Sequence, residues 1–273
     1  MITYTGLIPV YKNDRLDYLE AAVESLIKQT KPLDEIILVV EGDVNNEIER
    51  YLSGLILPII VLRINDQKGP LNFGLPASLN FGINNSKCDF ILRLDSDDFS
   101  VPHRLETIDR LLLENPELDL IGSWVDEYDE ELKEYISTRK VPTNASKIFS
   151  FGKWKNPFNG PSVVFRKTVA FELGGYPVVA SNEDYCFWAE FLVRGYAVRN
   201  LPESLVKMRT GLSMIPRRKS KRYRMGTIQS IAYIYSIGYF EFVHYCWHNL
   251  VNTLVRRLPE YVFFIIQFKL FRK

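Results

Sequence analysis

The chain has 273 residues, of which 47% are hydrophobic and 25% charged, and its formal net charge is +1. That length suits one large domain, or one domain with a small appendage, and the chain is hydrophobic enough to bury a core, so we do not expect a disordered chain. The charge is unevenly divided. Residues 207–273 hold thirteen lysines and arginines against two acids, a net of +11, and residues 1–206 carry a net of −10. A basic tail of this kind indicates nucleic acid or an anionic membrane surface as a partner.

Cysteine and histidine usage narrows the type of site. The cysteines, Cys88, Cys186 and Cys246, are widely spaced, and no secretory signal precedes them. This usage favours free thiols in a reducing cytoplasm. The three histidines form no zinc-like cluster with these cysteines, which argues against a structural zinc site.

The first half of the chain alternates apolar segments of strand length with segments of helical periodicity. The expected strands span residues 3–11, 35–40, 58–64, 88–95 and 118–125. The expected helices begin after Asn13 and Asp14 and after the second strand, and then span 76–86 and 101–116, with Pro102 in the first turn of the last. This alternation predicts an α/β fold, with a parallel sheet covered by helices on both faces and right-handed crossovers.

The fourth expected strand ends in the acidic sequence Asp95-Ser96-Asp97-Asp98. Ligands of such sheets bind beyond the carboxyl ends of the strands, and alternate residues at a strand end can direct Asp95 and Asp97 into one crevice. No GxGxxG or Walker loop follows the first strand, so phosphate would need another device, for which Mg²⁺ or Mn²⁺ held by carboxylates is suited. The alternative is a plain turn in which Ser100 caps the next helix. These residues alone leave both interpretations open.

A series of segments in fixed order resembles a known family. They are IPVYKND (8–14), VVEGD (39–43), KGPLNFGLPASLNFGI (68–83), LRLDSDD (92–98), NPFNGPSVVFRK with ELGGY (156–176), NEDYCFWAEFLVRGY (182–196), and VKMRTG with RRKS (206–220). The chain resembles the family-2 glycosyltransferases of the GT-A fold, and more narrowly the bacterial transferases of amylovoran-type exopolysaccharide, capsule and O-antigen assembly. The resemblance implies a Rossmann-like, mostly parallel central sheet flanked by helices. It also implies a catalytic region over 1–215, with a nucleotide-sugar half (1–100) and an acceptor half (101–215), and a helical, basic and aromatic extension over 216–273.

The resemblance assigns donor-side roles to matching residues. Those that would contact the nucleotide sugar are Pro9, Val10 and Tyr11 at the uracil or equivalent base, Glu41 at base or ribose, Lys68 and Gly69 in a loop near the nucleotide, Asn80 behind the donor, Ser96 at the donor site, and Arg209 with Arg217 or Arg218 at the diphosphate. In the DxD motif, Asp97 would ligate the metal, and Asp95 would contact ribose or metal-bound water. Without the resemblance, the first of these segments is a plain strand end and Lys68-Gly69 a plain turn.

On the acceptor side, the resemblance implies that Asp184 is the general base that removes the proton from the acceptor hydroxyl. Such a base, with a metal on the departing diphosphate, favours direct displacement with inversion at the anomeric carbon. Without the resemblance, Glu183 and Asp184 would only complement the dipole of a helix capped by Ser181 or Asn182. Trp188 on that helix suits the core and the acceptor wall equally well.

Two positions depart from the family's pattern. Gly160 stands where many relatives carry the histidine of NPxNHP. Gly211 stands where other branches carry a histidine two positions after the arginine matched by Arg209. We therefore expect no histidine among the metal ligands.

The C-terminal region combines basic clusters with aromatic residues. Residues 217–224 read RRKSKRYR, and the apolar stretches beyond, 228–240 and 261–271, fall short of the ~20 residues that a transmembrane helix needs. The pattern suits a helix in the lipid headgroup region, although a solvated loop is the alternative for the basic run. No recognised nucleic-acid motif accompanies it, so we expect an anionic membrane surface and no nucleic acid.

The sequence as a whole predicts an inverting, metal-dependent glycosyltransferase. Its expected donor is a nucleotide sugar, with UDP as the expected nucleotide, and its expected acceptor is an undecaprenyl-diphosphate-linked oligosaccharide at the cytoplasmic face of the plasma membrane. The alternatives are an inactive sugar- or nucleotide-binding scaffold and a nucleotidyltransferase. A scaffold should have lost the DxD motif or the base, and a nucleotidyltransferase should carry a glycine-rich loop near the first strand.

Overall fold

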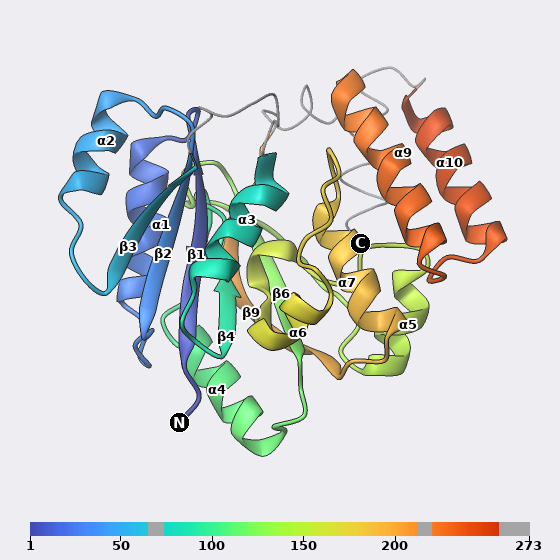
Figure 1. The fold of residues 1–273 in the computed structure, drawn as a ribbon, viewed down its shortest axis with the longest axis horizontal. Coiled ribbons are helices and arrows are strands. Elements are labelled where there is room, and N and C mark those ends of the chain that lie inside the picture. The colour runs from blue at the N-terminus through green and yellow to red at the C-terminus, as the bar shows by residue number, and fades with distance from the viewer. Residues whose placement is uncertain (65–73, 212–219, 257–273) are drawn as a thin grey trace.

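The computed structural model describes residues 1–64, 74–211 and 220–256. Within them, a central sheet with helices on both faces forms the body of the molecule (Figure 1). Two helices, α9 (Lys221–Ser236) and α10 (Phe242–Arg256), pack against each other at one end. The predicted α/β class is confirmed.

The first half of the sheet is parallel, as predicted. Its strands lie in the order β3-β2-β1-β4 and are β1 (Tyr4–Tyr11), β2 (Glu35–Glu41), β3 (Ile59–Ile64) and β4 (Phe90–Arg93). The helices that connect or follow them are α1 (Leu16–Ile27), α2 (Asn46–Ser53), α3 (Gly74–Asn85) and α4 (Arg104–Glu114). Pro102 precedes α4 by two residues, so its placement inside the first turn is wrong.

Beyond β4 the sheet is mixed. The strands of this half are β5 (Phe99–Ser100), β6 (Leu120–Tyr128), β7 (Tyr135–Arg139), β8 (Val164–Arg166) and β9 (Val198–Arg209). β8 lies between β4 and β6 and runs antiparallel to both, β9 pairs with β6 in parallel, and β5 and β7 pair antiparallel with β9 and β6. The fifth predicted strand is β6, and parallel pairing fails there because β8 separates it from β4.

The alternation of side chains along the strands builds a core on each face of the sheet. Ile8 and Val10 of β1 join the core beneath α1, α2 and α4. Leu7 joins the core beneath α3, α6 (Lys167–Glu172) and α7 (Glu183–Val193). The second core is strongly aromatic and includes Phe158, Phe165, Tyr176, Phe187, Trp188 and Phe191. Trp188 is fully buried, which confirms the core interpretation over the acceptor wall.

The C-terminal helices are attached to the body through α9. Gly226 allows α9 to approach the chain ahead of α7 so closely that a Cβ there would lie 2.5 Å from the Ser181 backbone nitrogen. Ser230 donates from its hydroxyl to the Ser181 carbonyl oxygen, and the Ser181 hydroxyl donates to the Tyr223 carbonyl oxygen at 3.1 Å. α9 therefore braces the segment that leads into α7.

The cysteines agree with the sequence analysis, whereas the apolar stretch 261–271 lies outside the described residues. Cys88, Cys186 and Cys246 are free, the first two being buried and the third exposed. Among the residues described, none of the helices combines the length and the apolar character needed to span a bilayer. The remaining elements are α5 (Ala145–Gly152) and the short 3₁₀ helix η1 (Gly160–Ser162), which precedes β8.

Candidate active site

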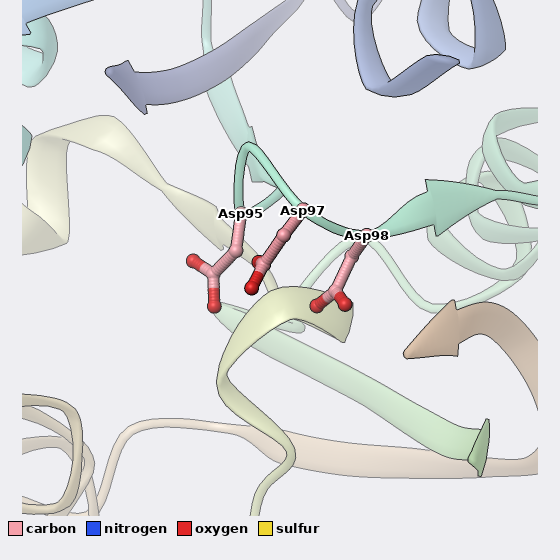
Figure 2. Close-up of side chains that lie close together, drawn as sticks. All are labelled: Asp95, Asp97 and Asp98. Atoms are coloured by element: carbon pink, nitrogen blue, oxygen red, sulfur yellow. The ribbon is translucent and has the colours of Figure 1, made fainter. Parts of the chain in front are cut away.

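An acidic turn follows β4 at the carboxyl edge of the sheet. Figure 2 shows the side chains of Asp95, Asp97 and Asp98 extending from it toward the same side. Each offers a carboxylate oxygen, and these oxygens lie within 4.8 Å of one another. Such a set of hard oxygen donors fits Mg²⁺ or Mn²⁺. Sequence analysis singled out Asp95 and Asp97 as ligands, and the geometry adds Asp98 to the cluster.

The three acids differ in exposure. Asp97 is exposed, Asp95 is half-buried, and Asp98 is buried, with its Oδ1 accepting a hydrogen bond from the Arg209 backbone N–H at 3.0 Å. Burial, reinforced by Asp97 and Asp95, raises the pKa of Asp98 well above its usual range. Asp98 therefore suits a buried hydrogen-bonding role, whereas Asp97 and Asp95 are accessible to a cation.

Two buried arginines lie beside this turn. Arg93 donates to Asp95 Oδ1 from Nε at 3.2 Å and from Nη2 at 3.0 Å. Arg104 is fully buried and donates from Nη2 to the Arg93 carbonyl oxygen at 2.9 Å. Burial lowers the pKa of Arg104 to about 9, while the charge of Asp98 opposes that shift. These cations offset the mutual repulsion of the acids.

Arg209 lines a crevice beside the acidic turn. Its Nη1 donates to the Asp97 carbonyl oxygen, its Nε donates to the Glu130 carbonyl oxygen at 2.9 Å, and its guanidinium lies 4.0 Å from the centre of the Tyr18 ring.

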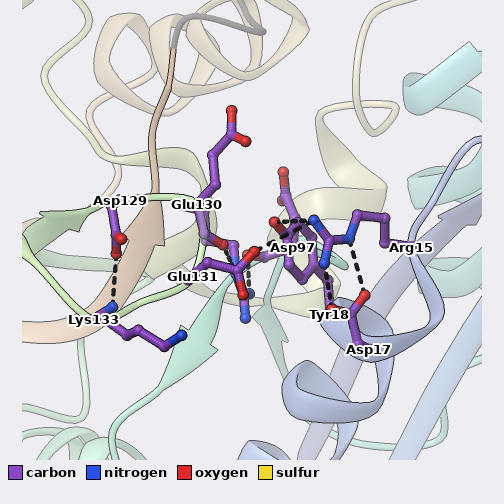
Figure 3. Close-up of polar contacts among 9 residues, drawn as sticks. Arg15, Asp17, Tyr18, Asp97, Asp129, Glu130, Glu131 and Lys133 are labelled. Atoms are coloured by element: carbon purple, nitrogen blue, oxygen red, sulfur yellow. Dashed lines mark hydrogen bonds and ion pairs between the residues drawn. The ribbon is translucent and has the colours of Figure 1, made fainter.

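Figure 3 shows Arg15 reaching over the same tyrosine to Asp17 and toward Glu131 in the β6–β7 turn. The crevice has a volume of about 320 Å³ and is lined by Ser96, Asp97 and Arg209, among others. The diphosphate contact assigned to Arg209 remains a prediction.

A second acidic group lies at the start of α7. Asp184 accepts hydrogen bonds from the Tyr185 backbone N–H at Oδ1 (2.7 Å) and from Asn156 Nδ2 at Oδ2 (3.0 Å). Glu183 is buried, and burial together with the charge of Asp184 raises its pKa to about 7, against the lowering effect of Arg93. Asn182 occupies the cap position in the left-handed region (φ 56°) without a capping bond from its side chain. The predicted cap by Ser181 or Asn182 is therefore wrong, because Ser181 bonds to α9 instead.

The two acidic groups meet at Arg93 and Gly160. A Cβ built on Gly160 would lie 3.1 Å from Asp184 Oδ2 and 3.3 Å from Arg93 Nη1. Arg93 in turn holds Asp95, so the DxD turn and the Asp184 carboxylate share one site although they are far apart in sequence. Sequence analysis missed Arg93 and Asn156. The available signal for Arg93 was its position two residues before Asp95, which places both on the same side of an extended chain.

The other predicted donor residues are divided between the core and the strand ends. Val10 is fully buried in the core, and Pro9 is buried next to it, so only their backbone can reach a ligand. Tyr11 is half-buried at the end of β1. The Glu41 carboxylate accepts from the Gly74 backbone N–H at 2.8 Å and from the Ser78 hydroxyl at 2.9 Å. Its nucleotide contact remains a prediction.

Residues 7–174 match the family described as Glycosyl transferase family 2. The chain belongs to this family. It is 31% identical over 258 residues to the amylovoran biosynthesis glycosyltransferase AmsE of Erwinia amylovora, with 94% of each chain covered. It is 30% identical over 256 residues to UDP-Gal:alpha-D-GlcNAc-diphosphoundecaprenol beta-1,3-galactosyltransferase of Escherichia coli, with 94% of this chain and 92% of the relative covered. The protein is thus a family-2 glycosyltransferase, which decides against the nucleotidyltransferase and scaffold alternatives.

Solved structures support the fold of this family-2 glycosyltransferase. S. aureus TarS 1–349 in complex with UDP-GlcNAc superposes with a TM-score of 0.64 at 16% identity, covering 98% of this chain and 77% of that one. The mannosyltransferase PcManGT of Pyrobaculum calidifontis, in complex with GDP-Man and Mn²⁺, has a TM-score of 0.61 at 14% identity and covers 95% and 71%. At this identity the likeness concerns the fold alone, and it confirms the predicted GT-A architecture.

The remaining assigned residues of this glycosyltransferase are Asn80, Ser96 and four that the structure does not describe. The Asn80 side chain donates to the Tyr176 carbonyl oxygen at 2.9 Å and accepts from the Tyr176 backbone N–H at 2.7 Å, so its amide fastens α3 to the loop before α7. Ser96 is buried within the acidic turn. Four assigned residues fall outside the described residues: Lys68, Gly69, Arg217 and Arg218.

Proposed function

We propose that this family-2 glycosyltransferase moves a sugar from a UDP-sugar to a hydroxyl of a diphosphoundecaprenol-linked saccharide, with inversion, in the synthesis of a bacterial surface polysaccharide. The observation that carries the proposal is the meeting of the two acidic groups at one site. The exposed Asp97 and half-buried Asp95 lie on one side, and Asp184 lies beyond Arg93 and Gly160. The donor and acceptor classes are supported by the named substrates of the Escherichia coli relative and by the UDP-GlcNAc bound to TarS.

The donor side suits the departing diphosphate. When the bond between the anomeric carbon and the diphosphate breaks, its electron pair leaves with the diphosphate oxygen. Asp97 and Asp95 would hold Mn²⁺ or Mg²⁺, and a bound cation stabilises that added charge as a Lewis acid. Asp97 is the better ligand because it is exposed, and Asp95 is oriented by its two hydrogen bonds from Arg93.

The acceptor side suits a general base. Asp184 Oδ2 would take the proton of the acceptor hydroxyl as that oxygen bonds to the anomeric carbon from the face opposite the diphosphate. Asn156 and the Tyr185 backbone N–H hold the carboxylate in place, so it is oriented before substrate binds. Because the base and the leaving group act on opposite faces, the product has inverted configuration.

We further propose that α9 and α10 dock on an anionic membrane surface. The start of α9 carries the exposed basic side chains of Lys221, Arg222 and Arg224. α10 presents a continuous exposed apolar face, made of Phe242, Val243, Cys246, Trp247, Leu250 and Leu254. Such a face favours burial in the headgroup region, and each basic residue adds about 1 kcal/mol of attraction to anionic lipid. Membrane docking would bring the site close to a lipid-linked acceptor.

The activity is tested by incubating the purified protein and Mn²⁺ with a panel of UDP-sugars and an acceptor of synthetic lipid-linked diphosphate sugar. The expected result is a disaccharide whose new linkage, read by proton NMR, has the anomeric configuration opposite to that of the donor. A product with retained configuration would contradict the role of Asp184. Co-sedimentation with vesicles tests docking: binding should require anionic lipid and weaken in Trp247→Ser, and equal binding to neutral vesicles would exclude the basic contribution.

A further inference from the structure

Arg93 occupies an unusual position between the two acidic groups. It is the last residue of β4, and only 3% of its surface is exposed. Two of its nitrogens, Nε and Nη2, donate to Asp95 Oδ1. The third, Nη1, is buried and has no hydrogen-bond partner within the part of the chain that the structure describes. A buried guanidinium N–H without a partner is costly, so this nitrogen calls for an explanation.

Gly160 lies on one side of Nη1, and the ring of the buried Tyr176 packs near the same guanidinium, with its centre 5.8 Å from the central carbon. A Cβ at position 160 would lie 3.3 Å from Nη1 and 3.1 Å from Asp184 Oδ2, so both atoms border the same methyl-sized space beside the glycine. The charges of Asp95, Glu183 and Asp184 all act on Arg93. A side chain at position 160 would crowd the guanidinium and the carboxylate at once.

We propose that Arg93 is a positioning residue that joins the metal acid to the base, with Nε and Nη2 holding Asp95 and Nη1 orienting Asp184 across the space beside Gly160. The proposal rests on the proposed function for the roles of the two carboxylates. A single planar guanidinium would then set the geometry between the departing diphosphate and the base. Arginine is required because its fixed fork presents donors in two directions, which a lysine ammonium does not reproduce.

A double-mutant cycle on thermal unfolding tests the link between Arg93 and Asp184 without any substrate. The proteins are wild type, Arg93→Lys, Asp184→Asn and the double variant. Coupled residues should give melting-temperature shifts that fail to add by roughly 2 °C or more. Arg166→Lys is the matched control, because Arg166 pairs with Asp119 rather than with either site acid, and its shift should add to that of Asp184→Asn. Additive shifts for Arg93→Lys would overturn the proposal.

Gly160→Ala tests the same space by kinetics. The added methyl should displace the nearer atom, Asp184 Oδ2, while Arg93 keeps its bonds to Asp95. We therefore expect kcat to fall by about 10-fold or more while KM for the UDP-sugar stays within about 2-fold. If the glycine had a purely structural role, the variant would have a lower melting temperature and less folded enzyme, but the folded enzyme would keep its kcat. An unchanged kcat, or a loss confined to KM, would overturn the proposal.

The two proposals fail in different ways. If wild-type protein binds no UDP in the presence of Mn²⁺ and transfers no sugar, the proposed function falls. The unfolding cycle would still decide whether Arg93 is coupled to Asp184.

Discussion

The acidic turn after β4 and the acidic pair at the start of α7 handle their charges in different ways. In the turn, Asp95, Asp97 and Asp98 are balanced by arginines that are partly or wholly buried, and the most exposed acid, Asp97, faces the crevice. In the pair, Glu183 is buried with a raised pKa, and Asp184 is held mainly by neutral donors.

This difference matches the two tasks of a glycosyl transfer. A cation site needs acids that stay ionised and close together, and neighbouring arginines make that tolerable. A general base, the role proposed for Asp184, needs a carboxylate that can accept a proton, and neutral amide donors orient Asp184 without neutralising it. Arg93 bonds Asp95 and lies beside the space that borders Asp184, so it contacts both groups.

Asp184→Asn should have the largest effect. The amide keeps the shape of the carboxylate but cannot take a proton, so kcat should fall by about 1,000-fold, or about 4 kcal/mol in activation free energy. Affinity for UDP with Mn²⁺, measured by calorimetry, should stay within about 2-fold. Retained turnover would exclude Asp184 as the base.

The buried Glu183 should make stability depend on pH. Its folded pKa is raised from 4.5 to about 7, so between these values the folded state holds a proton that the unfolded state has released. The free energy of unfolding should therefore fall as pH rises from about 4.5 to 7, by about 3 kcal/mol from this group. Urea unfolding of wild type and Glu183→Gln between pH 5 and 8 measures the difference, and parallel curves would contradict the raised pKa.

The two neighbouring acids Asp97 and Asp98 form a matched pair of tests. Asp97→Asn should weaken UDP binding in the presence of Mn²⁺ by roughly 30-fold, or about 2 kcal/mol. Asp98→Asn should change it by less than about 3-fold, because Asp98 is buried and Asn can still accept from the Arg209 backbone N–H. Loss of Mn²⁺-dependent binding in Asp98→Asn would instead make Asp98 a ligand.

Gly226→Ala should give the smallest effect, and it tests whether α9 supports the segment that leads into α7 and Asp184. A Cβ there would lie 2.5 Å from the Ser181 backbone nitrogen, so α9 must shift, at a cost of about 1.5 kcal/mol in unfolding free energy. Gly238→Ala tests left-handed backbone (φ 81°) without any such contact and serves as a comparison. If Gly226→Ala leaves both stability and kcat unchanged, α9 does not support the segment before α7.

Local patterns were enough to predict the first half of the fold. The strands β1 to β4 are apolar and their connections are helical, so periodicity and the rule that ligands bind at strand ends located the Asp95–Asp98 turn. Of the later strands only β6 was predicted, because the pairing of the others is non-local: β8 has three residues and is recognisable only by its place between β4 and β6.

The site was predictable only in part for the same reason. Asp95, Asp97 and Asp184 carry motif signals, whereas the contact between Arg93, Gly160 and Asp184 depends on how three distant segments pack. Val10 shows what a motif does not reveal: its side chain lies in the core, and its assignment to the base pocket remains a prediction for its backbone. Motifs in the sequence indicate which side chains are available for the reaction, and the packing of the fold decides which of their atoms face the site.

The proposed donor site is tested most directly by calorimetric titration of the purified protein with UDP, with and without Mn²⁺, using GDP and CDP as controls. We expect UDP to bind only when Mn²⁺ is present and to bind more tightly than GDP or CDP. If none of the three nucleotides binds with Mn²⁺ present, the acidic turn after β4 is not the donor site, and the proposed reaction is contradicted.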